Sequence, residues 1–249
     1  MTTRVVVITG GASGLGLATG RRFAADGWTV AVIDSDPVAI AEIGNAAVGL
    51  VCDVTDGAAL VDAFARIAEE LGSVDSVVCS AGVLRVGPLR DMPEDEFDRV
   101  MAVNLKGSWL TVKSAMPHLE RSAHAGSDPS IVLLASVAAL RHKANSGAYA
   151  ASKSAVVAMC KVLAVEVAPL GIRVNAVAPG TVDTPMTRVH LAPAEGAYRA
   201  SGAAPLHGRR TGEDDVAAAI AFLASADASF VTGAVLPVDG GSSAALVAT

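Results

Sequence analysis

Thr9-Gly10-Gly11-Ala12-Ser13-Gly14-Leu15-Gly16 joins a short run of β-branched residues, Val5–Thr9, to a segment with helical periodicity, Leu15–Asp26. Its glycines are spaced Gly-x-x-x-Gly-x-Gly. Residues without a Cβ let the backbone approach a ligand closely, and the free N–H groups and positive dipole at the start of a helix attract a phosphate. The stretch predicts a strand, a phosphate-binding turn and a helix, and a glycine-rich turn without a ligand is the alternative for this segment alone.

The alternation of strand and helix continues along the whole chain. Six further β-branched runs predict strands at Thr29–Asp34, Gly49–Cys52, Ser76–Ser80, Ile131–Ser136, Arg173–Ala178 and Ala234–Val238. Helical periodicity lies between them at Ala58–Leu71, Glu94–Leu119, Ala148–Val167 and Asp214–Ala224. We therefore predict a single α/β domain over residues 1–249, a doubly wound sheet of seven parallel strands with helices on both faces. In such sheets a ligand binds beyond the carboxyl ends of the strands.

Composition excludes several classes of protein. The chain has 249 residues, 52% of them hydrophobic, with a formal charge of −6 and no basic stripe, so it predicts neither a disordered chain nor a nucleic-acid partner. No apolar run reaches the ~18–20 residues of a membrane span, and the short apolar start is unlike a signal peptide, so we expect no membrane association and a cytoplasmic location. Three widely spaced cysteines and five histidines without ligand spacing predict buried thiols and no metal.

Asp34 bears on the choice of cofactor. It ends the second predicted strand, eighteen residues after Gly16, where a carboxylate accepts hydrogen bonds from the ribose hydroxyls of an adenosine and repels a 2′-phosphate. This placement favours NAD over NADP. Asp34 also suits the turn Asp34-Ser35-Asp36-Pro37, and both interpretations can hold together.

Tyr149 and Lys153 are the candidate catalytic pair. Positions four apart share a helix face, and a neighbouring cation stabilises a phenolate, so Tyr149 can act as a base near neutral pH. Ser136 ends the fifth predicted strand, where its hydroxyl can polarise a substrate carbonyl. Asn104 lies in an apolar helical stretch and by itself is best interpreted as a hydrogen-bonded core amide.

Taken together, these residues resemble the short-chain dehydrogenase/reductases of the shorter, cofactor-first type, over essentially the whole chain. The resemblance rests on the glycine pattern, on Asp53-Val54 and on Asn104, Ser136, Tyr149 and Lys153 in their order and spacing. It also rests on Asn175-Ala176-Val177-Ala178-Pro179-Gly180, on Thr184 and on Asp239-Gly240-Gly241. The family implies a Rossmann-like fold and a homotetramer built through the two long helices and the last strand.

The resemblance also implies roles for individual residues. Tyr149 is the general acid/base, Ser136 the substrate oxyanion partner, Lys153 the cation that also binds ribose, and Asn104 the anchor of a proton relay through water. Asp53 and Val54 contact adenine, and Thr184 the nicotinamide carboxamide. The complete expected set of cofactor-binding residues is Gly10, Ser13, Gly14, Leu15, Gly16, Asp34, Asp53, Val54, Ser80, Ala81, Gly82, Tyr149, Lys153, Pro179, Gly180, Val182 and Thr184.

One departure from the family is visible after the fourth strand. The usual Asn-Asn-Ala-Gly reads Cys79-Ser80-Ala81-Gly82, so the side-chain tie that steadies the sheet beneath the cofactor is in question.

We therefore predict an NAD-dependent oxidoreductase that interconverts a secondary alcohol and a ketone. The alternative within the family is a 3-oxoacyl carrier-protein reductase, which normally uses NADPH and a basic residue where this chain has Ser13. A non-catalytic NAD-binding protein is the alternative from another class, and the intact Ser136, Tyr149 and Lys153 oppose it. The long interval after Pro179 predicts a substrate lid at about residues 184–210.

The residues around the predicted catalytic pair bear on the substrate. We expect Ser136, Ala138, Asn145, Tyr149 and Met186 to contact it. Most other side chains near the catalytic residues are small or apolar, namely Val83, Val137, Ala139, Leu140, Thr181 and Leu191. Such a lining favours an uncharged cyclic or aliphatic substrate over an anionic hydroxy acid, and we discount the neighbouring charged and polar residues Arg141, His142, Arg188 and His190 as solvated.

Overall fold

A computed structural model describes residues 3–43, 47–190, 206 and 208–244, with the backbone alone at 47, 189 and 190. Its described residues form one parallel sheet of seven strands in the order β3-β2-β1-β4-β5-β6-β7. The strands are β1 (Val5–Thr9), β2 (Thr29–Asp34), β3 (Ala47–Val51), β4 (Ser76–Cys79), β5 (Ser130–Leu134), β6 (Arg173–Pro179) and β7 (Val235–Val238). The predicted fold class is confirmed. The order of the strands reverses between β1 and β4, which places a ligand crevice at their carboxyl ends.

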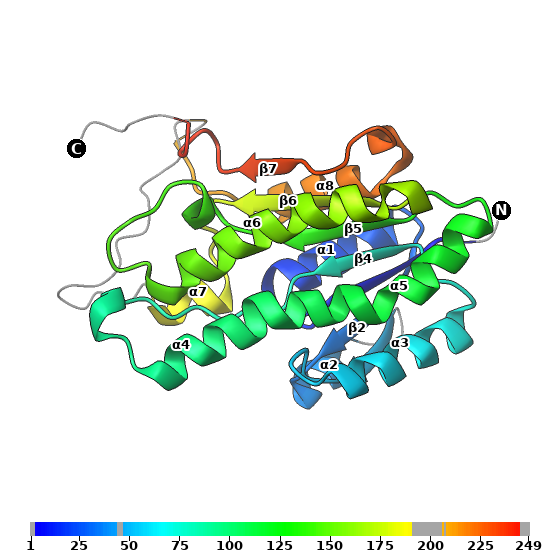
Figure 1. Ribbon diagram of the computed structural model, residues 1–249, viewed down its shortest axis with the longest axis horizontal. Coiled ribbons are helices and arrows are strands. Elements are labelled where there is room, and N and C mark those ends of the chain that lie inside the picture. Colours follow the sequence, from blue (N-terminus) through cyan, green and yellow to red (C-terminus); the bar gives the residue numbers. More distant parts are fainter. Residues whose placement is uncertain (1–2, 44–46, 191–205, 207, 245–249) are drawn as a thin grey trace.

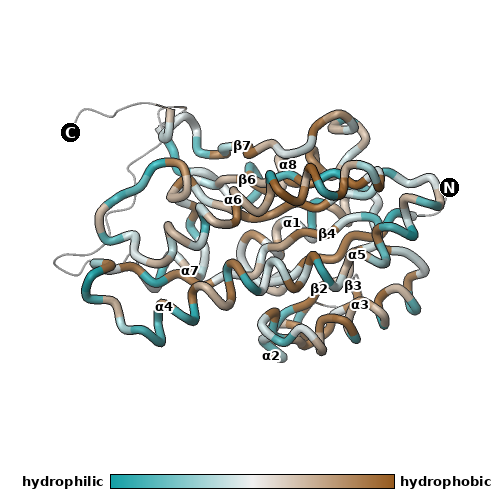
Figure 2. Tube along the Cα trace, viewed as in Figure 1, coloured by the Kyte–Doolittle hydropathy of each residue, from teal (hydrophilic) through white to brown (hydrophobic). Residues whose placement is uncertain are grey.

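Helices cover both faces of the sheet (Figure 1). On one face lie α1 (Gly14–Ala25) and α8 (Glu213–Ala224), and on the other lie α3 (Gly57–Leu71), α5 (Ser108–His124) and α6 (Gly147–Val167). Alternate residues of β1 point to opposite faces, so Val6 and Ile8 join one apolar core and Val7 the other. Figure 2 shows the hydrophobic residues concentrated along the sheet, whereas α4 (Glu94–Met101) is largely hydrophilic. This two-sided burial explains why the strands are nearly continuous apolar runs.

The predicted helix Glu94–Leu119 is helical throughout, but it is not one regular α-helix. It consists of α4, a π-helical segment at Ala102–Gly107, and α5, which continues to His124. The π-helical segment adds one residue to each turn, and such segments are frequent at functional sites. Periodicity could not reveal it, because the buried positions stay three or four residues apart across the segment, at Val100, Val103, Gly107, Thr111 and Ala115.

Two short helices were also missed. Helix α2 (Pro37–Glu42) is capped by the Asp36 carboxylate, which accepts hydrogen bonds from the N–H groups of Val38 and Ala39. Helix α7 (Pro185–His190) lies inside the predicted lid. Each has only six residues, too few to show a helical period.

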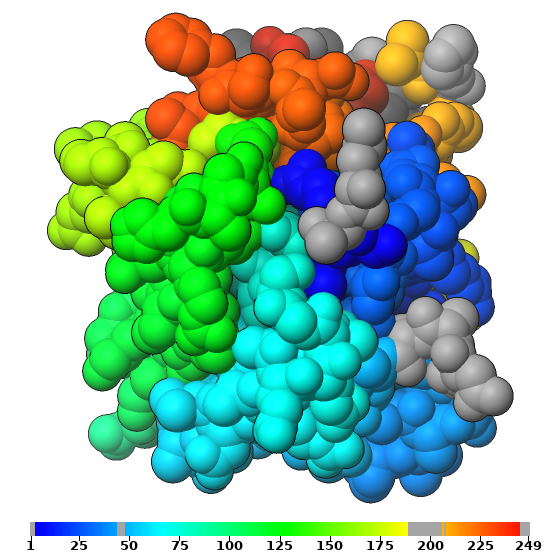
Figure 3. Space-filling model, turned by 90° about the vertical axis from the view of Figure 1, so that its right-hand side faces the viewer, coloured from blue at the N-terminus to red at the C-terminus, as the bar shows by residue number. Residues whose placement is uncertain are grey.

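Figure 3 views the molecule from the side at which the strands in Figure 1 begin. Asp75, directly before β4, ties the start of β1 to this end of the sheet. Its carboxylate is 4% exposed and accepts hydrogen bonds from the Val5 N–H and from the hydroxyls of Ser73, Ser122 and Ser127. Burial alone would raise the pKa of Asp75, but these hydrogen bonds outweigh it and lower the pKa. The charge is therefore stabilised far from the crevice.

Within the part of the chain that the structure describes, no helix is long and apolar enough to cross a membrane.

Candidate active site

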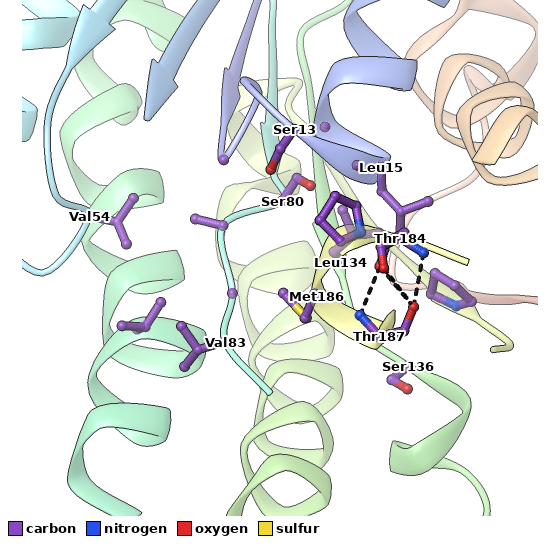
Figure 4. A pocket seen from close by; sticks show the side chains of 18 of the residues that line it. Ser13, Leu15, Val54, Ser80, Val83, Leu134, Ser136, Thr184, Met186 and Thr187 are labelled. Atoms are coloured by element: carbon purple, nitrogen blue, oxygen red, sulfur yellow. Dashed lines mark hydrogen bonds between the residues drawn. The ribbon is translucent and has the colours of Figure 1, made fainter. Parts of the chain in front are cut away.

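A pocket of about 250 Å³ opens at the carboxyl ends of the strands, beside the point where the strand order reverses. Figure 4 shows side chains from Ser13, Ser80, Met186 and Ser136 around it. Every residue that the sequence predicted to bind the cofactor lines this pocket, although these residues lie at or after the carboxyl ends of six different strands: Gly10, Ser13, Gly14, Leu15, Gly16, Asp34, Asp53, Val54, Ser80, Ala81, Gly82, Tyr149, Lys153, Pro179, Gly180, Val182 and Thr184. The carboxyl edge of the sheet brings them together.

The glycine-rich turn is packed too tightly for side chains. A Cβ on Gly16 would lie 2.1 Å from the Gly10 carbonyl oxygen, and one on Gly10 would lie 2.6 Å from the Ala81 Cα. Gly10 and Gly14 have φ of +66° and +47°, which glycine adopts at little cost. The Ser13 side chain does not cap α1, so the first N–H groups of that helix face the pocket without a side-chain acceptor from Ser13. This arrangement suits a diphosphate.

Asp34, the last residue of β2, lines the pocket. One carboxylate oxygen, Oδ2, accepts a hydrogen bond from the Ala12 N–H at 3.0 Å, and Oδ1 accepts one from the Asp36 N–H at 3.2 Å. The residue is therefore both a turn residue and a negative charge next to the glycine-rich turn. The two interpretations drawn from the sequence coexist in the geometry.

Lys153 is a buried cation beneath Tyr149. Its Nζ donates a hydrogen bond to the Leu134 carbonyl at 2.7 Å and lies 5.9 Å from the centre of the Tyr149 ring. Burial lowers the pKa of Lys153 to about 8, and the neighbouring Cys79 thiol opposes that shift. Both Tyr149 and Lys153 stand on the first turns of α6, so their mutual placement follows from the i, i+4 spacing.

Ser136 follows β5 and faces the same pocket (Figure 4). Its Oγ accepts a hydrogen bond from the Ala138 N–H at 3.1 Å, and the side chain is only slightly exposed. Because that bond uses an oxygen lone pair, the hydroxyl hydrogen can be donated to an oxygen atom in the pocket.

Asn104 does not line the pocket but lies behind its wall, in the π-helical segment, with 0% exposure. Its Oδ1 accepts from the Val83 N–H at 2.8 Å, and its Nδ2 donates to the Val83 carbonyl and to the Ser152 hydroxyl. All side-chain polar atoms of Asn104 are therefore hydrogen-bonded to protein, as the sequence-based interpretation of a satisfied core amide expected.

Only some of the residues expected to contact the substrate line the pocket. Ser136, Tyr149 and Met186 line the pocket, whereas Ala138 and Asn145 do not. Asn145 instead adopts φ +63° in the loop before α6, where its carbonyl accepts a hydrogen bond from the Gly87 N–H. Of the remaining apolar residues expected near the substrate, Val83 lines the pocket, whereas Val137, Ala139, Leu140 and Thr181 do not. Within the expected lid, α7 is described, and residues 191–205 and 207, Leu191 included, lie outside the described residues.

Several pocket residues were missed by sequence reasoning, among them Arg99, Cys52, Val103, Pro185 and Thr187. Thr187 had a local signal, because Thr184-Pro185-Met186-Thr187 is a typical helix start. The Thr184 N–H donates to the Thr187 Oγ1, and the Thr187 N–H donates to the Thr184 Oγ1 (Figure 4). Arg99 had none, since it stands on the polar helix α4 and faces the pocket only through the packing of that helix.

The departure at Cys79-Ser80 leaves the turn after β4 held by its backbone. The Ser80 N–H donates to the Thr9 carbonyl at 3.1 Å, and no side-chain hydrogen bond from Ser80 to another described residue accompanies it. The Cys79 thiol is buried, and burial raises its pKa to about 12. The described residues also contain no group of three metal-ligating side chains.

The chain is similar to known dehydrogenases and reductases over nearly its whole length. The sequence profile of a family described as enoyl-(acyl carrier protein) reductase matches residues 10–243. The chain is 40% identical, over 96% of its length and 96% of the relative, to cis-4-hydroxycyclohexanecarboxylate dehydrogenase of Sinomonas cyclohexanicum.

Two solved structures are similar to this one. The ligand-free aldohexose dehydrogenase of Thermoplasma acidophilum has a TM-score of 0.87 and 35% identity, covering 99% of this chain and 97% of that one. The 3-ketoacyl-(acyl-carrier-protein) reductase of Brucella melitensis, complexed with NADH, has a TM-score of 0.86 and 33% identity, covering 96% and 98%.

Proposed function

Because this chain belongs to the short-chain dehydrogenase/reductase family, we propose that it is an oxidoreductase that uses NAD to interconvert a secondary alcohol and a ketone, with Tyr149 as general acid/base. The observation that carries the proposal is one pocket in which Ser136, Tyr149 and Lys153 face the glycine-rich turn that suits a diphosphate.

The residues present fit a nicotinamide dinucleotide. The first N–H groups of α1 would hold the diphosphate, Asp34 the adenosine ribose, and Thr184 the carboxamide. Because Gly16 has no Cβ, the Gly10 carbonyl can pack against the start of α1, and the turn stays compact beside the first N–H groups of that helix. When bound, the nicotinamide accepts or supplies the hydride.

The protein's own residues would move the proton. In the oxidation direction Tyr149 takes the hydroxyl proton of the substrate while Ser136 donates a hydrogen bond to the same oxygen. Lys153, still mostly protonated near neutral pH with its pKa of about 8, lies close enough to stabilise the phenolate form of Tyr149. Its burial, with Nζ fixed on the Leu134 carbonyl, keeps that charge from being screened by solvent.

Replacing Tyr149 with Phe tests this assignment. The ring still packs, so the fold and the affinity for NADH should change little, while kcat should fall by about 10²–10⁴-fold because proton transfer is lost. Turnover of cyclohexanol and of cis-4-hydroxycyclohexanecarboxylate with NAD⁺ is followed by NADH absorbance, and binding by NADH fluorescence. If Y149F keeps more than about a tenth of the activity, the role of Tyr149 is wrong.

The same two alcohols test the substrate class. The pocket walls near Ser136 carry apolar side chains such as Val83 and Met186, which support an uncharged cyclic or aliphatic substrate. The name of the dehydrogenase from Sinomonas cyclohexanicum, in contrast, specifies a carboxylate. A kcat/KM at least about tenfold higher for the carboxylate than for cyclohexanol would overturn the expectation of a neutral substrate, and would direct attention to Arg99 as a cation in the pocket.

A 3-oxoacyl carrier-protein reductase is the second candidate, and the similarity to the enzyme of Brucella melitensis favours it. Preferential reduction of a 3-oxoacyl thioester with NADPH would establish this candidate. Asp34 opposes it, because a carboxylate at this place repels the 2′-phosphate of NADPH.

We also propose that copies of the chain associate through α5, α6 and β7 as a homotetramer. Exposed apolar side chains on or next to these elements support it: Trp109 is 44% exposed, Val165 is 76% exposed and Phe230 is fully exposed. Light scattering at micromolar concentration should give four times the mass of the chain, and a monomer would refute the assembly.

A further inference from the structure

A line of side-chain hydrogen bonds crosses from the pocket wall to the backbone of Tyr149. The Asn104 side-chain amide accepts a hydrogen bond from the N–H of Val83, which lines the pocket, and donates one to the Val83 carbonyl. Its Nδ2 also donates to the Ser152 Oγ at 3.0 Å. The Ser152 hydroxyl in turn donates to the Tyr149 carbonyl at 2.8 Å. The Asn104 amide thus joins the π-helical segment to the turn after β4, and the Ser152 hydroxyl joins Asn104 to α6.

The hydroxyl of Ser152 has a role that few groups can replace. It accepts a hydrogen from Asn104 and donates its single hydrogen to Tyr149, and a hydroxyl is the smallest side-chain group that does both. Ser152 and Asn104 are each 0% exposed, so bulk solvent contacts neither side chain. Removing the hydroxyl would leave one Asn104 N–H without an acceptor and would break the only side-chain link described between Asn104 and α6.

We propose that Ser152 is a positioning residue, which fixes the first turn of α6, and with it Tyr149, against the pocket wall at Val83. The inference rests on the proposed role of Tyr149 as general acid/base. Ser152 does not line the pocket and acts only through Tyr149 and Asn104. Small displacements of a catalytic group have large effects on rate, since a shift of about 1 Å can cost about 100-fold.

Ser154 provides a matched control on the same helix. Its hydroxyl donates to the Ala150 carbonyl at 2.9 Å, the same kind of bond to the preceding turn, but it makes no bond to Asn104 or to another segment of the described chain. If the bond to the preceding turn were what mattered, S152A and S154A would behave alike. If the connection to Asn104 matters, they differ.

The experiment compares wild type, S152A, S152T, S154A and Y149F with NAD⁺ and whichever of cyclohexanol and cis-4-hydroxycyclohexanecarboxylate the wild type oxidises faster. Melting curves and NADH fluorescence are measured on the same samples, at a temperature well below each unfolding midpoint. We expect kcat of S152A to fall about 10- to 100-fold while its affinity for NADH stays within about twofold. S154A should stay within about twofold of wild type, and S152T, which restores the hydroxyl, should recover most of kcat.

Other outcomes refute the inference or its premise separately. Three results overturn the positioning role: a kcat for S152A within about threefold of wild type, an equal loss of kcat in S154A, or a folded S152T as slow as S152A. If Y149F is inactive in the same experiment, the proposed function still stands. An active Y149F overturns the proposed function itself. If S152A does not fold, S152C, which keeps the volume but is a weak acceptor, takes its place with the same expected loss of kcat.

Discussion

Asp34→Asn is the substitution that tests cofactor choice most directly. The change keeps a side-chain oxygen that can accept from the Ala12 N–H, which the carboxylate now engages at 3.0 Å, and it removes the negative charge. Two opposing consequences follow. Hydrogen bonds from ribose hydroxyls to a neutral amide are weaker than those to a carboxylate, by about 1 kcal/mol, so NAD⁺ should bind roughly fivefold more weakly.

NADP⁺ should bind more tightly to the same variant. A carboxylate and a 2′-phosphate of about two charges, roughly 5 Å apart in a water-like medium, repel each other by about 1.7 kcal/mol. Relief of this repulsion predicts about 20-fold tighter binding of NADP⁺, and the ratio of the two dissociation constants should therefore move by about 100-fold. Fluorescence titration with NADH and NADPH in buffers of fixed ionic strength measures that ratio, because salt screens the repulsion.

Asp36→Asn is the matched control. It removes the same charge two residues away, and Asn caps α2 as well as Asp does, so the N–H groups of Val38 and Ala39 keep their acceptor. Asp36 does not line the pocket, and its replacement should leave the ratio within about threefold. The reasoning is refuted if wild type binds NADPH as tightly as NADH, or if D34N and D36N shift the ratio equally.

Two further predictions concern the frame around the site. G16A should lower the free energy of unfolding by about 3 kcal/mol and weaken NADH binding, because its Cβ would meet the Gly10 carbonyl at 2.1 Å. G20A on the same helix makes only ordinary contacts and should raise the free energy of unfolding by about 0.5–1 kcal/mol. Denaturant titration compares the two variants. D75N should cost about 2 kcal/mol at pH 7. The folded pKa of Asp75 lies below its unfolded value, so its stabilisation is present above about pH 4 and is lost as pH falls through the folded pKa, and acid unfolding should be less steep in D75N than in wild type.

Local patterns carried much of the prediction. Alternating β-branched and helical segments determined the parallel sheet, because each strand must be buried on both faces and each crossover needs a helix. The glycine spacing marked the tight turn after β1, and the i, i+4 relation of Tyr149 and Lys153 placed both on one helix face. Residues at strand ends could be assigned to one site without knowing the order of the strands, because all strands of a parallel sheet end at the same edge.

Local sequence patterns therefore predict the sheet, its ligand-binding edge and the residues whose chemistry depends on near neighbours in the chain. The tertiary structure alone decided how Asn104 is satisfied, why Ser152 matters, that Arg99 faces the pocket and that Asn145 does not line it. These features arise where segments distant in sequence meet, and the π-helical turn that orients Asn104 leaves no mark in the apolar period of its helix. A contact between segments depends on register and packing, which are properties of the whole fold and not of any single stretch of residues.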